Sequence, residues 1–198
     1  IPVRKSLLLR ESGSVPGIIE PLVKKKILAS VSLEVGRLKD FGDQMEPLRQ
    51  LSENQLIAYN SIKSHFREKD IVLLHGITSS GKTEIYIHLI EEQLRKGKQV
   101  LYMLPEIALT TQIILRLQKH FGPVTGVYHS RFNDQEKVEI WKKVAEEDPE
   151  KGYRLVLGVR SSVFLPFRNL GLVIVDEEHD GSYKQHDPAP RYHARDSA

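Results

Sequence analysis

The stretch that constrains this chain most is the eight-residue motif Gly76-Ile77-Thr78-Ser79-Ser80-Gly81-Lys82-Thr83. Its glycines, lysine and hydroxyl have the spacing of a Walker A loop, which holds the phosphates of a nucleoside triphosphate. The apolar run 71–74 before it predicts a buried strand, and residues 84–96 after it predict a helix. The alternative is an ordinary Gly-Ser-Thr turn that opens a helix, and the complete motif in this context disfavours that alternative.

Each part of the motif has a physical role in binding a polyphosphate. The glycines let successive backbone N–H groups point inward, and the helix that follows adds the positive end of its dipole. We expect Lys82 to reach the β- and γ-phosphates and Thr83 to bind Mg²⁺. The expected cofactors are therefore ATP and Mg²⁺, held by residues 76–83.

Composition sets the limits for the rest of the chain. The 198 residues suffice for one good core, and 40% hydrophobic with 28% charged residues is typical of a soluble globular protein. No apolar run is long enough to cross a bilayer, so we expect no membrane partner and a cytoplasmic location. The absence of cysteine excludes disulfides and cysteine-ligated metals from this chain. The net charge of +3 permits a polyanionic partner without requiring one.

Residues 1–50 differ in pattern from the rest. Helix, turn, helix and strand signals over 1–38 predict a partial winged-helix segment, and residues 39–50 predict a linker. The cluster Lys24-Lys25-Lys26 either contacts DNA or a partner, or is simply favoured at a helix C-terminus. The chain begins at Ile1 without an initiator methionine, and we expect it to be a piece of a longer protein.

Residues 51–198 alternate between helical and strand patterns. Near-continuous apolar runs are typical of parallel strands buried on both faces, so the pattern predicts an α/β fold with a doubly wound parallel sheet. The first helix should have Leu56, Ile57, Tyr59 and Ile62 as its inner face, and the last should have Val138, Trp141, Val144 and Ala145. The expected helices are 52–66, 84–96, 107–121 and 133–147, and the expected strands are 71–74, 99–104, 124–128, 155–159 and 172–175.

A second chemical cluster, Asp176-Glu177-Glu178-His179, follows the last apolar run. The carboxyl end of a strand is where a parallel α/β sheet presents residues to its ligand. We expect Asp176 to hold Mg²⁺ through water and Glu177 to orient and deprotonate the attacking water. The alternative, a solvated acidic turn, is disfavoured by the Walker A loop upstream.

The two clusters and the blocks between them, 104–110, 129–130 and 158–167, resemble the superfamily 2 helicases. Within that superfamily, the tail 176–196 is similar to the primosomal replication-restart helicases. The resemblance covers 51–198 well and 4–38 loosely. It implies a RecA-like ATP-binding lobe of an ATP-dependent 3′-to-5′ DNA helicase, an ATP hydrolase that reloads replication forks. The alternatives are a DNA-binding or partner-docking module whose nucleotide site is silent, and a P-loop ATPase that never touches DNA.

The resemblance also implies roles for individual residues. Gln55 would read adenine, although its capping-box spacing with Ser52 explains it equally well. His179 would couple the nucleotide to DNA, and its alternative is an ordinary satisfied polar group. The segment 183–193 would stack on or clamp single-stranded bases, and its alternative is a mobile surface loop. The candidate DNA contacts are Thr110, Arg160, Tyr183, Lys184, Arg191, Tyr192 and Arg195. For Thr110 the alternative is local hydrogen bonding, and for Arg160 it is an ion pair.

Several features depart from the family pattern. Ser79 stands where glycine is usual and Val159 where threonine is common, and Ser79 would be strained if it needs a positive φ. The second helicase lobe with its arginine finger, the cysteine-rich zinc module and a complete N-terminal DNA-end domain are absent from this sequence. We therefore expect this chain to bind nucleotide far better than it hydrolyses it, with zinc only in the missing region. The implied partners are single-stranded and forked DNA, primosome proteins and single-strand-binding proteins.

Overall fold

The computed structural model describes residues 21, 25, 45–77 and 80–198. The chain divides into two units, Ile1–Leu38 and Lys39–Ala198, and the fold below is that of the second. The predicted winged-helix segment, including Lys24-Lys25-Lys26, lies outside what the described residues can test.

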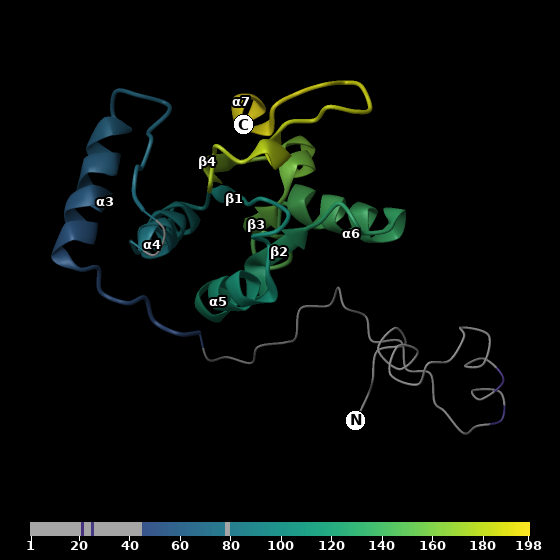
Figure 1. Ribbon diagram of the computed structural model, residues 1–198. Helices are drawn as coiled ribbons and strands as arrows, with labels where there is room; N and C mark the ends of the chain where they lie inside the picture. The colour runs from purple at the N-terminus through teal and green to yellow at the C-terminus, as the bar shows by residue number, and fades with distance from the viewer. Residues whose placement is uncertain (1–20, 22–24, 26–44, 78–79) are drawn as a thin grey trace. The chain divides into compact units, whose positions relative to one another are not determined.

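A parallel sheet forms the centre of the second unit (Figure 1). The strand order is β2-β3-β1-β4, and every pairing within it is parallel. Strands that follow one another in the chain are therefore joined by crossovers, which the helices supply. The strands are β1 (Gln99–Met103), β2 (Thr125–Tyr128), β3 (Leu155–Gly158) and β4 (Leu170–Val175).

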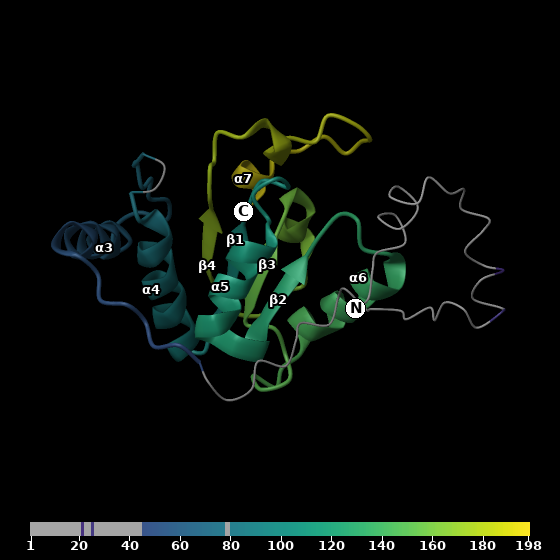
Figure 2. The same cartoon turned by 60° about the horizontal axis from the view of Figure 1, so that its bottom comes forward.

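Successive side chains of β1 enter two separate cores. Val100 and Tyr102 pack into the core formed with α4 (Lys82–Arg95) and α5 (Thr111–Phe121). Leu101 and Met103 pack into the core formed with α6 (Asp134–Ala145). Figure 2 shows α4 and α6 on opposite sides of the sheet. The predicted doubly wound α/β architecture is therefore confirmed.

Helix α3 (Glu53–His65) begins with the predicted capping box between Ser52 and Gln55. It packs on α4, where Ile62 is buried against Ile85 and Leu89. The predicted inner face is wrong in part, because Leu56 and Ile57 are 48% and 62% exposed. A helix that rests on a single neighbouring helix buries only one narrow stripe.

The predicted inner face of α6 is also partly wrong. Ile140 and Val144 are buried against the sheet, whereas Val138 and Trp141 are 53% and 49% exposed. Residues four apart lie on one side of a helix, so the stripe that contains Ile140 and Val144 turns Trp141 outward. The helix itself is confirmed, and Asn133 caps it through the N–H of Glu136 as its spacing indicates.

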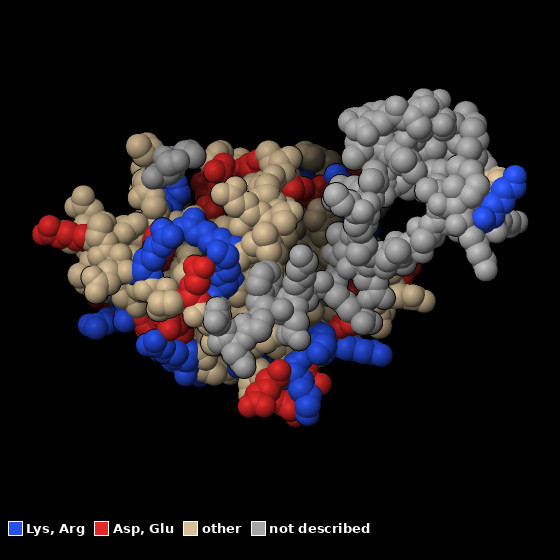
Figure 3. Space-filling model, turned by 90° about the horizontal axis from the view of Figure 1, so that it is seen from below, with Lys and Arg blue, Asp and Glu red and all other residues tan. Residues whose placement is uncertain are grey.

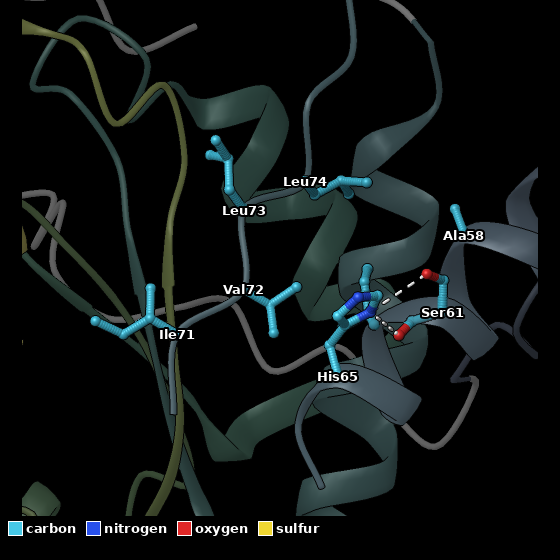
Figure 4. Close-up of a pocket in the computed structure, with 8 residues that line it drawn as sticks. Ala58, Ser61, His65, Ile71, Val72, Leu73 and Leu74 are labelled. Carbon is cyan, nitrogen blue, oxygen red and sulfur yellow. Dashed lines mark hydrogen bonds between the residues drawn. The ribbon is translucent and has the colours of Figure 1, made fainter. Parts of the chain in front are cut away.

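The predicted strand 71–74 does not form, and the chain has no regular secondary structure there. Val72 and Leu74 pack toward α3 and α4, while Ile71 and Leu73 are 88% and 71% exposed. Figure 4 shows Val72 and Leu74 directed toward α3, away from Ile71 and Leu73. The hollow between 71–74 and α3 has a volume of about 310 Å³. Alternating burial is typical of a strand, but a strand also needs a hydrogen-bonded neighbour. Within the described ranges the edge strand β4 pairs only with β1, so the segment 71–74 does not join the sheet there.

Shorter elements complete the unit. Helix α5 begins at Thr111, later than predicted, because a turn that starts at Pro105 comes first. Residues 45–50 have no regular secondary structure. Glu46 attaches them to the rest of the unit, because its N–H donates to the carbonyl of Lys119 at 2.8 Å. None of the helices in the described part of the chain has the length and apolarity that a membrane crossing needs. The remaining elements are η2 (Gly122–Val124), η3 (Arg160–Phe164), η4 (Gly181–Tyr183) and α7 (Ala194–Ser197).

Candidate nucleotide site

The Walker A motif occupies the turn that leads into α4. Gly81 is the N-cap of that helix and has φ +85°, a left-handed conformation that favours glycine. A Cβ atom at Gly81 would also clash with the side-chain nitrogen of Gln55. The left-handed φ explains why glycine stands at this point of the motif, whereas the Gln55 amide is the end of a flexible side chain and could move aside. Thr78 and Ser79 lie outside the described residues, so the strain expected at Ser79 stays a prediction.

Lys82 folds back onto the loop that precedes it. Its Nζ donates to the carbonyl of Gly76 at 2.5 Å and to that of Ile77 at 3.2 Å. An ammonium group has three donors, so these bonds pre-position the lysine over the loop while leaving it capacity for an anion. Thr83 follows in the first turn of the helix and is half-buried.

Gln55 connects α3 to the same loop. Its Oε1 accepts the N–H of Ser52 at 2.9 Å, which closes the capping box. Its Nε2 donates to the carbonyl of Gly81 at 3.2 Å, 26 residues further along the chain. The capping role proposed for Gln55 is confirmed. Contact with adenine stays a prediction, and the side chain lies beside the loop where such a contact would form.

Asp176 stands directly beyond β4, at the carboxyl end of the sheet. Its N–H donates to the carbonyl of Met103 at 3.0 Å, which continues the pairing of β4 with β1 by one residue. Its Oδ1 accepts the N–H of Glu177 at 3.1 Å, and its Oδ2 accepts the hydroxyl of Tyr102 at 2.8 Å. Each carboxylate oxygen can accept two bonds, so both retain an acceptor site.

Two tyrosines link this carboxylate to the Walker A helix. Tyr86 lies one turn after Thr83 on α4, and its ring meets that of Tyr102 edge-on with centroids 5.7 Å apart. Burial, followed by the charges of Asp176 and Glu177, raises the pKa of Tyr86 to about 12. Burial and Asp176 raise the pKa of Tyr102 as well, so its hydroxyl stays protonated and donates.

This link brings the first turn of α4 and Asp176 into one neighbourhood. No motif in the sequence identifies Tyr86 or Tyr102 as part of it. The available signal was the tyrosine hydroxyl inside the apolar run 99–104. In a strand buried on both faces, such a hydroxyl needs a hydrogen-bond partner.

The oxygen donors on α4 and at the end of β4 suit magnesium. The Thr83 hydroxyl and the Asp176 carboxylate are hard oxygen donors, the type that Mg²⁺ prefers. Within residues 45–77 and 80–198, no group of three or more His, Asp or Glu side chains could hold a metal by itself. One or two protein oxygens completed by substrate phosphates and water are the usual magnesium arrangement in nucleotide sites, so the donor set fits.

The residues after Asp176 diverge in their contacts. Glu177 has φ +49° and is exposed, which turns the chain away from the strand direction. Glu178 is paired with Arg195 of α7 at 2.8 Å. His179 is exposed, and its coupling role stays a prediction.

Tyr183 is placed differently from its predicted role. Its side chain is fully buried in the α6-side core, and its hydroxyl donates to the main-chain carbonyl of Asp176 at 2.6 Å. A ring with no exposed surface cannot stack on a base in this conformation. The prediction that Tyr183 contacts DNA is therefore wrong for this structure, and the residue supports the strand end that carries Asp176.

The other residues of the predicted aromatic loop are more accessible. Lys184 and Arg191 are exposed, and a bridge between Lys184 and His193 closes the loop at its base. Tyr192 is half-buried, and its ring meets Phe164 edge-on at 4.9 Å. To stack on a base, the Tyr192 ring would have to leave its contact with Phe164.

Two arginines proposed as DNA contacts already have protein partners. Arg160 donates to the carbonyls of Ser182 and Lys184 at 3.3 and 2.8 Å, which attaches η3 to the tail. The ion pair considered for it does not form with any described carboxylate. Arg195 is bonded to Glu178 and to Asp196, at 2.8 and 2.9 Å. Phosphate contacts by either arginine stay predictions.

Thr110 is the exposed N-cap of α5 and makes no capping hydrogen bond through its side chain. Thr110 therefore precedes the helix, and its hydroxyl does not make the local hydrogen bond to the first turn that a capping residue would make. Figure 3 shows one face of the molecule, on which lysine and arginine lie among aspartate and glutamate. Ion pairs such as Arg168–Glu147 and Lys151–Asp148 neutralise much of the local positive charge.

Comparison with known proteins agrees with this geometry. The family model "DEAD/DEAH box helicase" matches residues 45–196. The replication restart protein PriA of Bacillus subtilis is 40% identical over 197 residues, which cover 96% of this chain and 24% of that protein. PriA of Rickettsia felis is 42% identical over 193 residues, which cover 98% of this chain and 28% of that protein. The chain thus spans about a quarter of the length of these relatives.

One solved structure supports the fold. The ATP-dependent Type ISP restriction-modification enzyme LlaBIII, bound to DNA, superposes with a TM-score of 0.51 at 17% identity, over 77% of this chain and 12% of that enzyme. The resemblance to superfamily 2 helicases and to the replication-restart family is confirmed by the family model and the PriA relatives. The chain belongs to the DEAD/DEAH box helicase family.

Proposed function

We propose that this chain is the ATP-binding lobe of an ATP-dependent 3′-to-5′ DNA helicase of replication restart. The observation that carries the proposal is the link Tyr86–Tyr102–Asp176, which joins the helix of the Walker A loop to the acidic box at one edge of the sheet. Phosphate-binding and metal-binding groups in one neighbourhood are what hydrolysis of ATP requires. The likeness to PriA, a replication restart protein, supports the pathway.

Each residue of the site then has a defined task. Lys82 and the N–H groups of residues 76–83 bind the β- and γ-phosphates. Thr83 and Asp176 would hold Mg²⁺, which neutralises charge on the phosphoryl group when it is bound. Glu177, exposed beside Asp176, orients the attacking water and accepts its proton. A transition-state arginine is supplied from outside this chain, so hydrolysis by the chain alone is slow.

The proposed nucleic-acid partner is single-stranded DNA at a fork. The exposed side chains of Lys184 and Arg191 lie on the loop closed by Lys184 and His193, where a backbone phosphate has access to them. Contacts with primosome and single-strand-binding proteins, a zinc module and the second lobe belong to the longer protein proposed by similarity.

A second candidate function is a DNA-binding or partner-docking module with a silent nucleotide site. The observation in its favour is that Lys82 is already bonded to the carbonyls of Gly76 and Ile77. Affinity for single-stranded DNA that falls with salt and is unaffected by nucleotide would support this function over the first.

The function is tested by replacing the matching segment of Bacillus subtilis PriA with this chain and measuring ATP-driven unwinding of 3′-tailed and 5′-tailed duplexes. We expect unwinding of the 3′-tailed substrate. Lys82→Ala should abolish unwinding while single-stranded DNA is still bound, which also shows that the chimera is folded. Unwinding that survives Lys82→Ala, or that requires a 5′ tail, would overturn the proposal.

A further inference from the structure

Tyr102 carries a hydroxyl into the interior of the sheet. The residue lies near the end of β1, is completely buried, and is paired in register with Ile174 of β4. Its hydroxyl donates to Asp176 Oδ2 at 2.8 Å. A buried hydroxyl without a partner is costly, so this bond constrains the carboxylate as well as the tyrosine.

Resting on the nucleotide site proposed above, we propose that Tyr102 is a positioning residue that fixes the Asp176 carboxylate in the orientation that binds Mg²⁺. Metal ligands commonly depend on a second residue that orients them, and loss of that residue weakens metal binding. Tyr102 does not reach the nucleotide or the metal in this role. It acts through Asp176 alone.

The main chain of Asp176 is held at two points, which leaves the side-chain rotation as the remaining freedom. Its N–H donates to Met103 at 3.0 Å, and its carbonyl accepts the Tyr183 hydroxyl at 2.6 Å. The N–H of Glu177 holds Oδ1 at 3.1 Å, and Tyr102 holds Oδ2. Because both carboxylate oxygens accept a hydrogen bond, the side chain cannot rotate freely, and the remaining lone pairs of the oxygens keep a fixed direction.

The ring of Tyr102 is fixed by the helix that carries the other proposed metal ligand. It packs edge-on against Tyr86, one turn beyond Thr83 on α4. Tyr102 thus contacts both the Asp176 carboxylate and the helix that carries Thr83, although 93 positions separate Asp176 and Thr83 in the sequence.

The test compares nucleotide binding with and without metal, using the 198-residue chain and a fluorescent, non-hydrolysable ATP analogue. In Tyr102→Phe, which removes one oxygen atom, we expect Kd in Mg²⁺ to rise about 10-fold. Kd in EDTA should stay within about two-fold, because phosphate contacts do not involve Asp176. Tyr153→Phe is the matched control, since Tyr153 precedes β3 at the edge of the sheet opposite Asp176, and its hydroxyl has no hydrogen-bond partner among the described residues. Both Kd values of this variant should match those of the unsubstituted chain.

The proposal would be overturned if Tyr102→Phe left the ratio of the two Kd values unchanged, either because neither Kd changes or because both rise equally. If the unsubstituted chain binds no nucleotide, the proposed function fails instead.

A double-mutant cycle measured without metal then still tests the role of Tyr102. The free energy of unfolding is measured for Tyr102→Phe, for Asp176→Ala and for the double variant. We expect the double variant to lose less than the sum of the single losses. Additive losses would show that the two side chains are not coupled.

Discussion

The ammonium group of Lys82 lies 2.5 Å from the carbonyl oxygen of Gly76, six residues earlier in the chain. A second bond at 3.2 Å joins it to the carbonyl of Ile77. The lysine thus spans the loop whose middle residues would surround the phosphates. A nucleotide that binds here has to compete with neutral carbonyls for a charged donor, and phosphate oxygens compete well because charge-assisted hydrogen bonds are the stronger ones.

Gln55 offers a substitution that separates its two bonds. Gln55→Glu keeps the acceptor for the Ser52 N–H, because glutamate serves equally in a capping box, but removes the donor to the Gly81 carbonyl. We expect the melting temperature to change little and the affinity for the ATP analogue to fall. Gln55→Ala should also lose the bond from the Ser52 N–H, at about 0.5–1 kcal/mol of the free energy of unfolding, while the Ser52 side chain still caps the helix. Equal nucleotide affinity in all three chains would contradict a role for Gln55 at the loop.

Tyr183 should behave as a core residue. Tyr183→Ala removes a fully buried ring and is expected to lower the free energy of unfolding by about 3–5 kcal/mol, measured by urea denaturation. Tyr183→Phe removes only the bond to the Asp176 carbonyl and should cost about 1 kcal/mol. A Tyr183→Ala chain that is as stable as its parent but binds single-stranded DNA more weakly would show that the ring acts on DNA after all.

Lys184 and Arg191 should act on DNA without affecting stability. Both side chains are exposed, and replacing either with alanine should lower affinity for single-stranded DNA several-fold and reduce the slope of log K against log salt by about 0.7, the value for one phosphate contact on a single strand. The matched control is Lys142→Ala, because Lys142 lies near the end of α6 that leads to the opposite edge of the sheet. Equal losses in the control would indicate a general charge effect.

Glu92 should make part of the stability depend on pH. Its bonds to Lys96 and to the Tyr59 hydroxyl, followed by Lys63, hold the pKa of its carboxyl at about 2, below the ordinary 4.5. A lowered pKa means that this stabilisation is complete above pH 4.5 and is lost as the pH falls toward 2.

Glu92→Gln is therefore expected to cost about 1 kcal/mol at pH 7, after allowance for solvent screening, and progressively less below pH 4.5. Urea denaturation of both chains between pH 7 and pH 3 measures the difference. Glu91→Gln removes the same charge one position earlier and serves as the control. A difference that is constant over this range would contradict the lowered pKa.

The sequence predicted the sheet well because its strands are buried on both faces. The runs at 99–104 and 155–159 contain no charged residue and are mostly apolar, which is typical of central parallel strands. The run at 71–74 has the same composition but no ladder partner among the described residues, and composition cannot reveal a missing partner. The inner faces of α3 and α6 were partly wrong for a related reason. Periodicity identifies an apolar side, and the neighbouring element decides how much of that side is covered.

The candidate site was predictable where a motif fixed both residue type and spacing. Lys82, Thr83 and Asp176 were identified in this way, and the structure brings their surroundings together. Tyr102 was not identified, because its role depends on the register between β1 and β4, which the sequence does not state. Tyr183 was assigned to DNA by its place in an aromatic loop. Its burial depends on how η4 packs against α6, which is again a tertiary property.

The most direct test of the account is equilibrium binding of the fluorescent ATP analogue, with Mg²⁺, to the 198-residue chain and to its Lys82→Ala and Lys96→Ala variants. Lys96 lies just beyond the other end of the same helix and controls for loss of a lysine. The account predicts saturable binding by the parent chain and by Lys96→Ala, and a loss of about 100-fold or more in Lys82→Ala with no change in circular dichroism. Equal affinity in Lys82→Ala and its parent would contradict the assignment of residues 76–83 as the nucleotide site.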